Sequence, residues 1–331
     1  MPACSVDPRD RGSRGIALWD SRACRSEEYG DYYRALPHAS GSEPIAPRRH
    51  GGLYGRSQRL HARSGTLTAQ AHRRDEDDVA IVTFTRDDKL NAVSGEMFDV
   101  LAAAVEDLEK REDLRVLLIA AEGRYFTSGV DITTMDGDPD HPDGVASGSS
   151  LRRSYRERAR HDLFDRLESV EKPVVLAVQG PCVGVGVELA ASCDFRLVSV
   201  QATFALPELA NLAVVPGSGG ISRLTRIIGP HWTKWLVVAG ETVDAEQALA
   251  IGLVHAVYQH EEFMERVQAF TRHLARQPGE AAGLAKLMID AALNLDRRMA
   301  RDLDRIVQTT LLTSPEHLDR VRRFSVRRRE G

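Results

Sequence analysis

The stretch from Pro181 to Asp194 reads PCVGVGVELAASCD and follows the apolar run VVLAV at 174–178, which is typical of a buried strand. Gly184 and Gly186 flank Val185, and the ELAASC that follows favours a helix directly after the strand. Glycine has no side chain to keep a ligand off the backbone, so the Val185 N–H can point outward near the helix N-terminus. Such an N–H stabilises negative charge that develops on a bound oxygen atom.

A second glycine-containing segment supplies another backbone donor. Residues 127–130, TSGV, are predicted to leave the end of a different strand. A site that stabilises developing charge rarely relies on one donor, and the Val130 N–H is placed to pair with that of Val185. The two segments together predict a backbone anion site.

Two glutamates accompany these donors. Glu188 opens the predicted helix, where an acid also stabilises the helix through its dipole alone, by about 0.3–1 kcal/mol. Glu208 follows Pro207 in the apolar segment LPEL, and its structural alternative is an acid in a surface loop. Position alone leaves each glutamate open between a structural and a catalytic role.

Hydrophobic spacing along the chain predicts alternating strands and helices. We expect ordered structure from about Asp77, strands at 79–86, 116–123, 174–178 and 194–200, and a loop at 203–220. Ser94 is predicted to precede a helix buried through Met97, Leu101, Val105 and Leu108. Further helices are expected at 151–172, buried through Leu163, Phe164, Leu167 and Val170, at 221–229, ended by Gly229-Pro230, and over most of the chain from Thr233. The order of strand, helix and strand predicts an α/β layer architecture.

The composition excludes several classes of protein. Apolar residues make up 42% of the chain and charged residues 28%, with no run of about eighteen apolar residues, as in a globular protein. The N-terminus lacks the basic-then-apolar order of a secretory signal. Four cysteines, Cys4, Cys24, Cys182 and Cys193, lack paired spacing and favour a reducing cytoplasm. No metal or redox cofactor is predicted, and His255 lies in an apolar context without ligand spacing.

Charge is distributed unevenly along the chain. Residues 1–74 hold thirteen arginines, no lysine and seven acids, a net +6, whereas the whole chain is −4. The arginines are scattered without aromatic interleaving or helical period, so we predict no nucleic-acid or membrane partner. A disordered extension is the favoured interpretation, and a segment read through a misplaced start codon is the alternative.

Four segments in order resemble the crotonase (enoyl-CoA hydratase/isomerase) family. They are FTSGVDI at 126–132, KPVVLAVQGPCVGVGVELAASCDFRLVSVQATFALPE at 172–208, VPGSGGISRLTRIIG at 215–229 and AGETVDAEQALAIGLVHAV at 239–257. The similarity runs from about Val79 to Arg328. A dinucleotide-binding interpretation of the glycines fails, because GVGVEL contains no G-x-G-x-x-G.

The resemblance implies an α/β fold, a crotonase-like spiral of ββα units with a C-terminal helical trimerisation region. It divides the chain into a basic N-terminal extension at 1–74, a core with the acyl-CoA site at 75–255 and a helical oligomerisation region at 256–331. A homotrimer or a dimer of trimers is the implied assembly.

The resemblance also assigns site residues. Val130 and Val185 match the residues whose N–H groups form the family's oxyanion hole for the thioester carbonyl, and Glu188 and Glu208 match the acid/base glutamates of hydratases. Substrate contacts are implied for Lys89, Leu90, Ala92, Val130, Asp131, Ile132 and Val185. Phe324 and the arginines after it match a helix that in relatives helps form the neighbouring subunit's CoA pocket. The implied cofactor list is empty, because coenzyme A is part of the substrate.

These residues predict a lyase that adds water across the C2=C3 bond of an enoyl-CoA. The segment between Glu208 and the PGSGG turn is one residue longer than in most hydratases, so counting back from the turn puts Leu209 in the place of Glu208. Val185 replaces a common glycine, and Thr133 stands where hydratases often carry a basic residue. The alternatives are a double-bond isomerase of the same family and a non-catalytic acyl-CoA- or RNA-binding scaffold.

Overall fold

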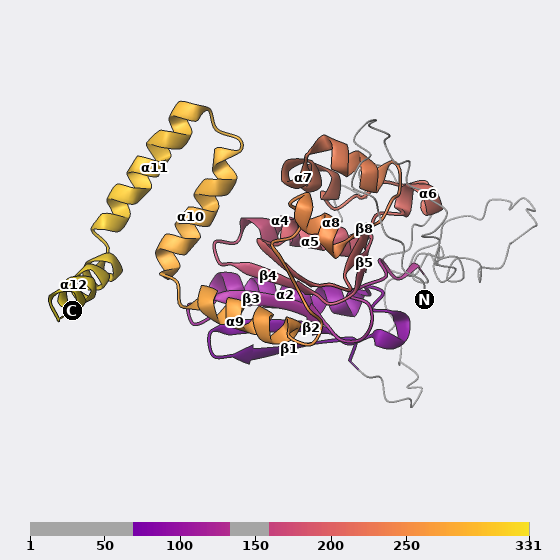
Figure 1. The fold of residues 1–331 in the computed structure, drawn as a ribbon, viewed down its shortest axis with the longest axis horizontal. Helices are drawn as coiled ribbons and strands as arrows, with labels where there is room; N and C mark the ends of the chain where they lie inside the picture. The colour runs from indigo at the N-terminus through magenta and orange to yellow at the C-terminus, as the bar shows by residue number, and fades with distance from the viewer. Residues whose placement is uncertain (1–68, 133–158, 331) are drawn as a thin grey trace, which may run out of the picture. The chain divides into compact units, whose positions relative to one another are not determined.

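Two β-sheets with helices on both sides make up most of the described chain (Figure 1). The structure, a computed structural model, describes residues 69–132 and 159–330. All of them belong to one compact unit, Gly65–Gly331. Its elements are β1 (Ala71–Glu76), β2 (Val79–Phe84), η1 (Asp87–Lys89), α2 (Gly95–Lys110), β3 (Val116–Ala121), α4 (Ala159–Ser169), β4 (Val174–Val178), β5 (Pro181–Val183), α5 (Val185–Ser192), β6 (Phe195–Ser199), β7 (Thr203–Ala205), α6 (Glu208–Leu212), α7 (Gly220–Val237), β8 (Val243–Asp244), α8 (Ala245–Ala250), β9 (Ala256–Tyr258), α9 (Phe263–Ala275), α10 (Gly279–Ala292), α11 (Arg297–Leu312) and α12 (Pro315–Glu330).

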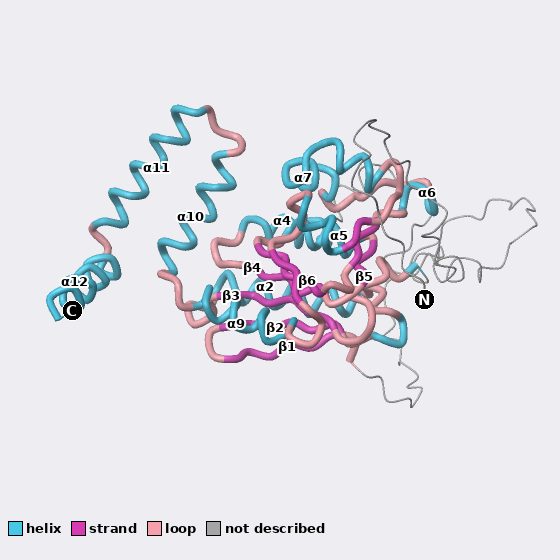
Figure 2. The backbone as a smooth tube through the Cα atoms, viewed as in Figure 1, coloured by secondary structure: helices cyan, strands magenta, loops and turns pink. Residues whose placement is uncertain are grey.

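The larger sheet has the strand order β1-β2-β3-β4-β6-β9, and the smaller one β5-β7-β8 (Figure 2). β1 pairs antiparallel to β2, and the other neighbours in the larger sheet are parallel. In the smaller sheet β5 and β7 are parallel and β8 is antiparallel. Parallel strands buried on both faces explain why β2, β3 and β4 are apolar runs without alternation.

Alternate residues of these strands pack into two separate cores. One face of the larger sheet packs against α9, and this core contains Val79, Ile81, Val116, Leu118, Val175, Ala177, Leu197, Phe263 and Val267. The other face packs against α2, α4 and α5, with Ala80, Val82, Phe84, Leu117, Ile119, Leu176, Met97, Leu101, Phe164 and Val187 among its members. The sheet is therefore the middle layer between helices, as the predicted layer architecture requires.

A repeated order of two strands and a helix runs through the core. β1-β2-α2, β4-β5-α5 and β6-β7-α6 each follow it. This is the ββα spiral that the resemblance implied. Thr127, in the segment after β3, bridges Cys182 of β5, and β5 pairs with β7 in the smaller sheet.

The predicted α2 is confirmed in detail. Ser94 is its N-cap, with Oγ accepting the Met97 N–H at 3.4 Å, and the four predicted core positions Met97, Leu101, Val105 and Leu108 are all buried. Of the helix expected at 151–172, residues 151–158 lie outside the described residues; Leu163, Phe164 and Leu167 are buried in α4, and Val170 is buried just after its end. Gly229 is non-helical (φ 75°, ψ 167°), so the helix expected to end there is interrupted.

Two sequence expectations are wrong. Order does not begin at Asp77, because β1 precedes it; β1 is a polar edge strand with only Ala71 buried, so it shows no apolar pattern. The region 203–220 is not a plain loop, since it contains β7 and α6, which are too short to give a period. Of the expected extension at 1–74, residues 1–68 are outside the described part of the chain. Thr133 is outside it as well.

The chain from Thr233 is mostly helical, as expected, with the short strands β8 and β9 in addition. Helices α10, α11 and α12 follow one another as an arm, and α10 joins this arm to the core (Figure 1). Lys286 of α10 donates to Asp194 Oδ2 at 2.8 Å at this joint. Among the described helices, none is both long enough and apolar enough to cross a membrane.

Candidate active site

The turn between β5 and α5 leaves one N–H without a partner. Gly184, the N-cap of α5, has φ 60° and ψ −122°, a backbone conformation that residues with a Cβ rarely adopt. Its carbonyl accepts the N–H groups of Val187 and Glu188 at 2.8 and 3.3 Å. The Val185 N–H lies too early in the helix for an intrahelical acceptor. Across residues 69–132 and 159–330 it donates to nothing.

The segment after β3 carries a second such N–H. Val130 forms a parallel bridge with Val93, in which Val93 N–H donates to Gly129 O at 2.8 Å and Asp131 N–H donates to Val93 O at 3.0 Å. Successive N–H groups of an extended chain point to opposite sides, so the Val130 N–H points away from Val93. It too finds no acceptor in the described ranges.

These two turns lie against each other. Thr127 forms a parallel bridge with Cys182, and the Val183 N–H donates to Thr127 O at 3.0 Å. A Cβ placed on Gly184 would lie only 3.6 Å from the Gly129 Cα. The residues just ahead of the two free N–H groups are therefore in contact.

Glu188 is buried one helical turn into α5. Its side chain is 4% exposed, and Oε2 accepts the N–H groups of Ser218 at 2.7 Å and Gly220 at 3.1 Å. Burial raises the pKa of Glu188 from 4.5 to about 7, even though these two hydrogen bonds favour the ionised form. Repulsion by Glu208 makes a smaller contribution to the increase.

Glu208 is the first residue of α6 and turns toward the same place. A Cβ on Gly184 would lie 2.8 Å from Glu208 Oε1, so only glycine leaves room for this carboxyl. Oε2 is buried and has no hydrogen-bond partner among the residues that the structure describes. Burial raises the pKa of this carboxyl as well. Both glutamates thus adjoin the glycine turn that precedes the Val185 donor.

The extra residue after Glu208 does not displace its carboxyl. Leu209, the alternative occupant of this position, is 40% exposed. Ala213 ends α6 in the left-handed conformation (φ 54°, ψ 34°), with its N–H directed at the carbonyls of Glu208 and Leu209. Glu208 therefore lies beside Gly184, and a tight turn at Ala213 follows its helix.

Arg86 links the segment at Lys89–Ala92, which is expected to contact CoA, to Asp131, which follows the Val130 N–H. Arg86 Nη1 donates to Ala92 O at 2.9 Å and pairs with Asp131 Oδ2 at 2.7 Å. Ala92 and Asp131 are 2% and 5% exposed, so their side chains face the protein. Lys89 is exposed and Leu90 and Ile132 are half-buried, which leaves these three side chains accessible.

Within the described ranges, no cluster of three His, Cys, Asp or Glu residues is arranged to hold a metal ion. Cys182 and Cys193 are both buried, and neither forms a disulfide with a cysteine that the structure describes. Burial raises the pKa of the Cys193 thiol to about 12.

The sequence family described as Enoyl-CoA hydratase/isomerase matches residues 74–329. The chain belongs to this family. A short-chain-enoyl-CoA hydratase of Clostridium acetobutylicum is 32% identical over 222 residues, which cover 67% of this chain and 81% of that protein. A 1,2-epoxyphenylacetyl-CoA isomerase of Escherichia coli K12 is 31% identical over 253 residues, covering 76% and 94%. A Thermobifida fusca YX structure in complex with CoA superimposes with a TM-score of 0.67 at 27% identity, covering 74% and 93%.

The chain is thus an enzyme of the enoyl-CoA hydratase/isomerase family. The structure gathers four of the predicted site residues, Val130, Val185, Glu188 and Glu208, around the two glycine turns. It keeps Phe324 apart from them, on α12 and 68% exposed.

Sequence reasoning missed several residues that hold the site. Ser218 and Gly220 bind Glu188 through their backbone, and Arg223 binds the turn that contains them. Arg86 plays the same part for the segment at Ala92. The PGSGG segment is recognisable in the sequence only as a family motif, and no local pattern there marks Arg223 as a residue that holds the turn.

Proposed function

We propose that this enzyme adds water across the C2=C3 bond of an enoyl-CoA thioester. The observation that supports this is the approach of two carboxyls, both with raised pKa, to a glycine turn whose neighbouring N–H groups have no acceptor among the described residues. Hydration needs a base for water, an acid for C2 and donors for the enolate oxygen, and these groups supply all three.

In the proposed reaction, the thioester oxygen accepts hydrogen bonds from the N–H groups of Val130 and Val185. Glu188 orients a water molecule and takes its proton as the water oxygen bonds to C3. The C2=C3 electron pair moves onto the thioester oxygen as an enolate, which the two N–H groups stabilise. Glu208 then donates a proton to C2 as the enolate collapses. No metal or separate cofactor takes part.

The states of the two carboxyls support these roles. Glu188 Oε2 is fixed by two backbone donors, which favour its ionised form as a base. Glu208 Oε2 is buried without a partner, an environment that favours the protonated acid. Two close carboxyls titrate as a pair, so one proton is readily retained while the partner is ionised.

For the remainder of the substrate we propose contacts from Lys89, Leu90 and Ile132, whose side chains are accessible, and from the backbone of Ala92 and Asp131. The Thermobifida fusca relative with bound CoA supports an acyl-CoA ligand. The two free thiols support a reducing compartment, the cytoplasm.

Double-bond isomerisation is the second candidate, because the matching family is described as containing both enoyl-CoA hydratases and isomerases. Isomerisation moves one proton between carbons and adds no water, so it requires one acid/base carboxyl. The placement of both Glu188 and Glu208 beside the Gly184 turn favours hydration.

Crotonyl-CoA tests the proposal. Wild-type enzyme is expected to yield a product heavier by one water, and Glu188→Gln or Glu208→Gln to lower the rate by about 10²–10⁴-fold. Glu246→Gln, at an exposed position of α8, is the control and is expected to match the wild type. Wild-type-like hydration by either active-site variant contradicts the assigned roles. A product of unchanged mass indicates the isomerase, and binding without turnover the scaffold.

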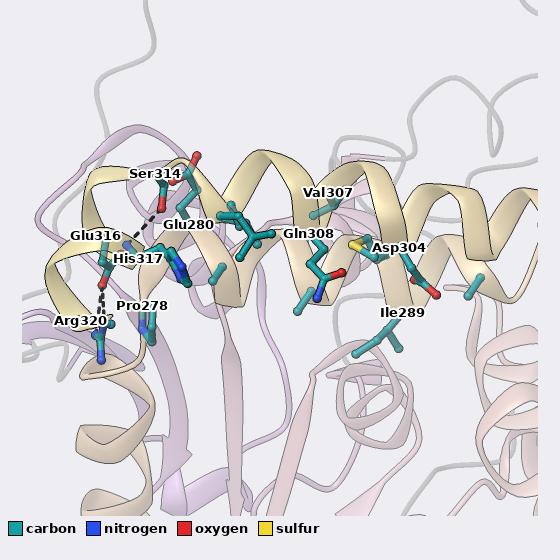
Figure 3. Close-up of a pocket in the computed structure, with 16 residues that line it drawn as sticks. Pro278, Glu280, Ile289, Asp304, Val307, Gln308, Ser314, Glu316, His317 and Arg320 are labelled. Carbon is teal, nitrogen blue, oxygen red and sulfur yellow. Dashed lines mark hydrogen bonds and ion pairs between the residues drawn. The ribbon is translucent and has the colours of Figure 1, made fainter. Parts of the chain in front are cut away.

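We also propose a homotrimer, or a dimer of trimers, assembled through the arm α10–α12. Its exposed apolar side chains include Ile289, Leu293, Met299, Ile306, Leu312, Val321 and Phe324. A groove of about 570 Å³ runs between the three helices, with Ile289 and Val307 along it and the Glu316–Arg320 pair at one end (Figure 3). Apolar surface of this extent supports an interface between copies. A monomer by light scattering contradicts it.

A further inference from the structure

The turn that holds Glu188 is itself held by a buried arginine. Arg223 lies on the first turn of α7 and is 4% exposed. Its Nη1 donates to the Ser218 carbonyl at 2.7 Å. Gly219 has φ 85°, and a Cβ there would lie 2.2 Å from Arg223 Nη1, so the arginine and the turn are in close contact.

The position of this hydrogen bond along the backbone matters. Glu188 receives N–H groups from the peptides that precede Ser218 and Gly220, and the Ser218 carbonyl belongs to the peptide between them. Fixing the middle peptide plane limits the rotation of both neighbours, because they share its Cα atoms. Arg223 therefore controls the direction of both donors to Glu188 without touching it.

Arg223 is held in turn by α4. Its Nε donates to Glu168 Oε2 at 2.8 Å, and its Nη2 pairs with Asp165. A guanidinium can bind three acceptors at once in a fixed plane, whereas a lysine ammonium acts as a flexible point charge. The side chain thus connects α4 to the turn through a rigid group.

We propose that Arg223 is a positioning residue for the acid/base glutamate: it holds the Ser218–Gly220 turn so that both backbone N–H groups remain on Glu188 Oε2. In relation to activity the proposal rests on the proposed function, but the geometry of the turn is independent of it. Loss of Arg223 releases the middle peptide, weakens two hydrogen bonds to the carboxylate and removes a nearby positive charge.

All three effects favour the protonated carboxyl. The pKa of Glu188 is about 7 because burial outweighs the two hydrogen bonds and the attraction of Arg223, so removing these raises it further. Other titratable groups lie on the elements around α5, and none of them is substituted in the variants compared. They are His161, which contacts Ser218 Oγ at 2.9 Å, Asp165 and Glu168 on α4, Cys182 on β5 and Glu208 on α6.

Direct titration of Glu188 tests the proposal. Protein labelled with ¹³C at glutamate carboxyls, with the Glu188 signal assigned by its absence in Glu188→Gln, is titrated as wild type, Arg223→Met, Arg223→Lys and Arg226→Met. Arg226 is the matched control, since it lies on the same helix and pairs with Glu168 at 3.3 Å but does not bind the turn.

Arg223→Met is expected to raise the Glu188 pKa by about one unit, which lowers the ionised fraction at pH 6 about tenfold. Arg223→Lys retains the charge but loses the planar fork, so we expect a smaller rise, of about 0.3 to 0.5 unit. Arg226→Met is expected to leave the value unchanged. The acidic limb of the kcat/KM profile with crotonyl-CoA is expected to move in parallel, with KM nearly constant.

An unchanged Glu188 pKa in Arg223→Lys, or an equal shift in Arg226→Met, overturns the proposal and leaves Arg223 a structural residue. The lysine variant decides the question if the methionine variant does not fold. If the wild type fails to hydrate crotonyl-CoA, the proposed function fails, and the carboxyl titration still tests the positioning role.

Discussion

At the residue scale, Glu188 couples the site to stability. Its folded pKa of about 7 lies above the ordinary 4.5, so the folded chain binds a proton that the unfolded chain has released between these pH values. A raised folded pKa contributes stability that is complete below pH 4.5 and is lost as pH rises through 7. Stability near neutral pH is thus lowered by the burial that raises the pKa of this carboxyl.

Glu188→Gln removes this dependence. We expect its free energy of unfolding, relative to wild type, to rise by about 2–3 kcal/mol between pH 5 and pH 8, since each pKa unit corresponds to about 1.4 kcal/mol. Urea unfolding at both pH values and one protein concentration measures it. The exposed Glu246→Gln is the control, and a difference that falls with rising pH contradicts the burial of Glu188.

At the element scale, α6 has to place Glu208 within a segment that is one residue too long. Five residues of helix end at Ala213, which adopts a left-handed conformation that costs a residue with a Cβ about 1–2 kcal/mol. Glu208 Oε1 nevertheless occupies the space beside Gly184 where a Cβ would lie, so the carboxyl reaches the glycine turn. The strain lies at the end of the element, away from the carboxyl.

Glycine substitutions in α6 are expected to act with opposite signs. Ala213→Gly relieves the left-handed alanine and should raise the free energy of unfolding by about 0.5–1 kcal/mol. Ala210→Gly, in the same helix, should lower it by up to about 1 kcal/mol, because glycine is a poor helix former. Urea unfolding of the pair checks this, and a loss of stability in both variants refutes the role given to Ala213.

The elements also separate what could be predicted from what could not. β2, β3, β4 and α2 were predictable, because buried runs and three-to-four-residue spacing mark them directly. β1 and α6 were not, since a polar edge strand and a five-residue helix give no periodic signal.

The same limit applies to the site. The glycines and glutamates were recognisable as local motifs and by their resemblance to a family. Arg223 was not, because its partners Asp165 and Glu168 are more than fifty positions away and lie beside it only after α4 packs on α7. Its burial, which singles it out among the arginines of α7, exists only in the folded chain.

At the scale of the whole described chain, a largely buried ion pair joins the core to the arm α10–α12. Lys286 Nζ donates to Asp194 Oδ2 at 2.8 Å, and the Leu167 and Lys172 carbonyls lie at 3.4 and 3.3 Å. Asp194 Oδ2 also accepts the Val174 N–H at 2.7 Å, where β4 begins. One carboxylate therefore joins α10, β4 and the end of α5.

Lys286→Met tests this joint. Burial raises the pKa of Asp194 although Lys286 opposes the rise, so removing the lysine leaves a buried carboxyl without its cation. We expect the free energy of unfolding to fall by about 2–3 kcal/mol, as when one partner of a largely buried pair is removed. We also expect faster amide hydrogen exchange in α10, because its anchor to the core is lost.

Lys110→Met is the control: it removes an exposed pair with Glu106 on α2 and should change neither the free energy of unfolding nor the exchange rate in α10. Equal effects of the two variants would show that other contacts hold the arm, whereas an effect confined to Lys286→Met identifies the ion pair as an anchor of α10 to the core.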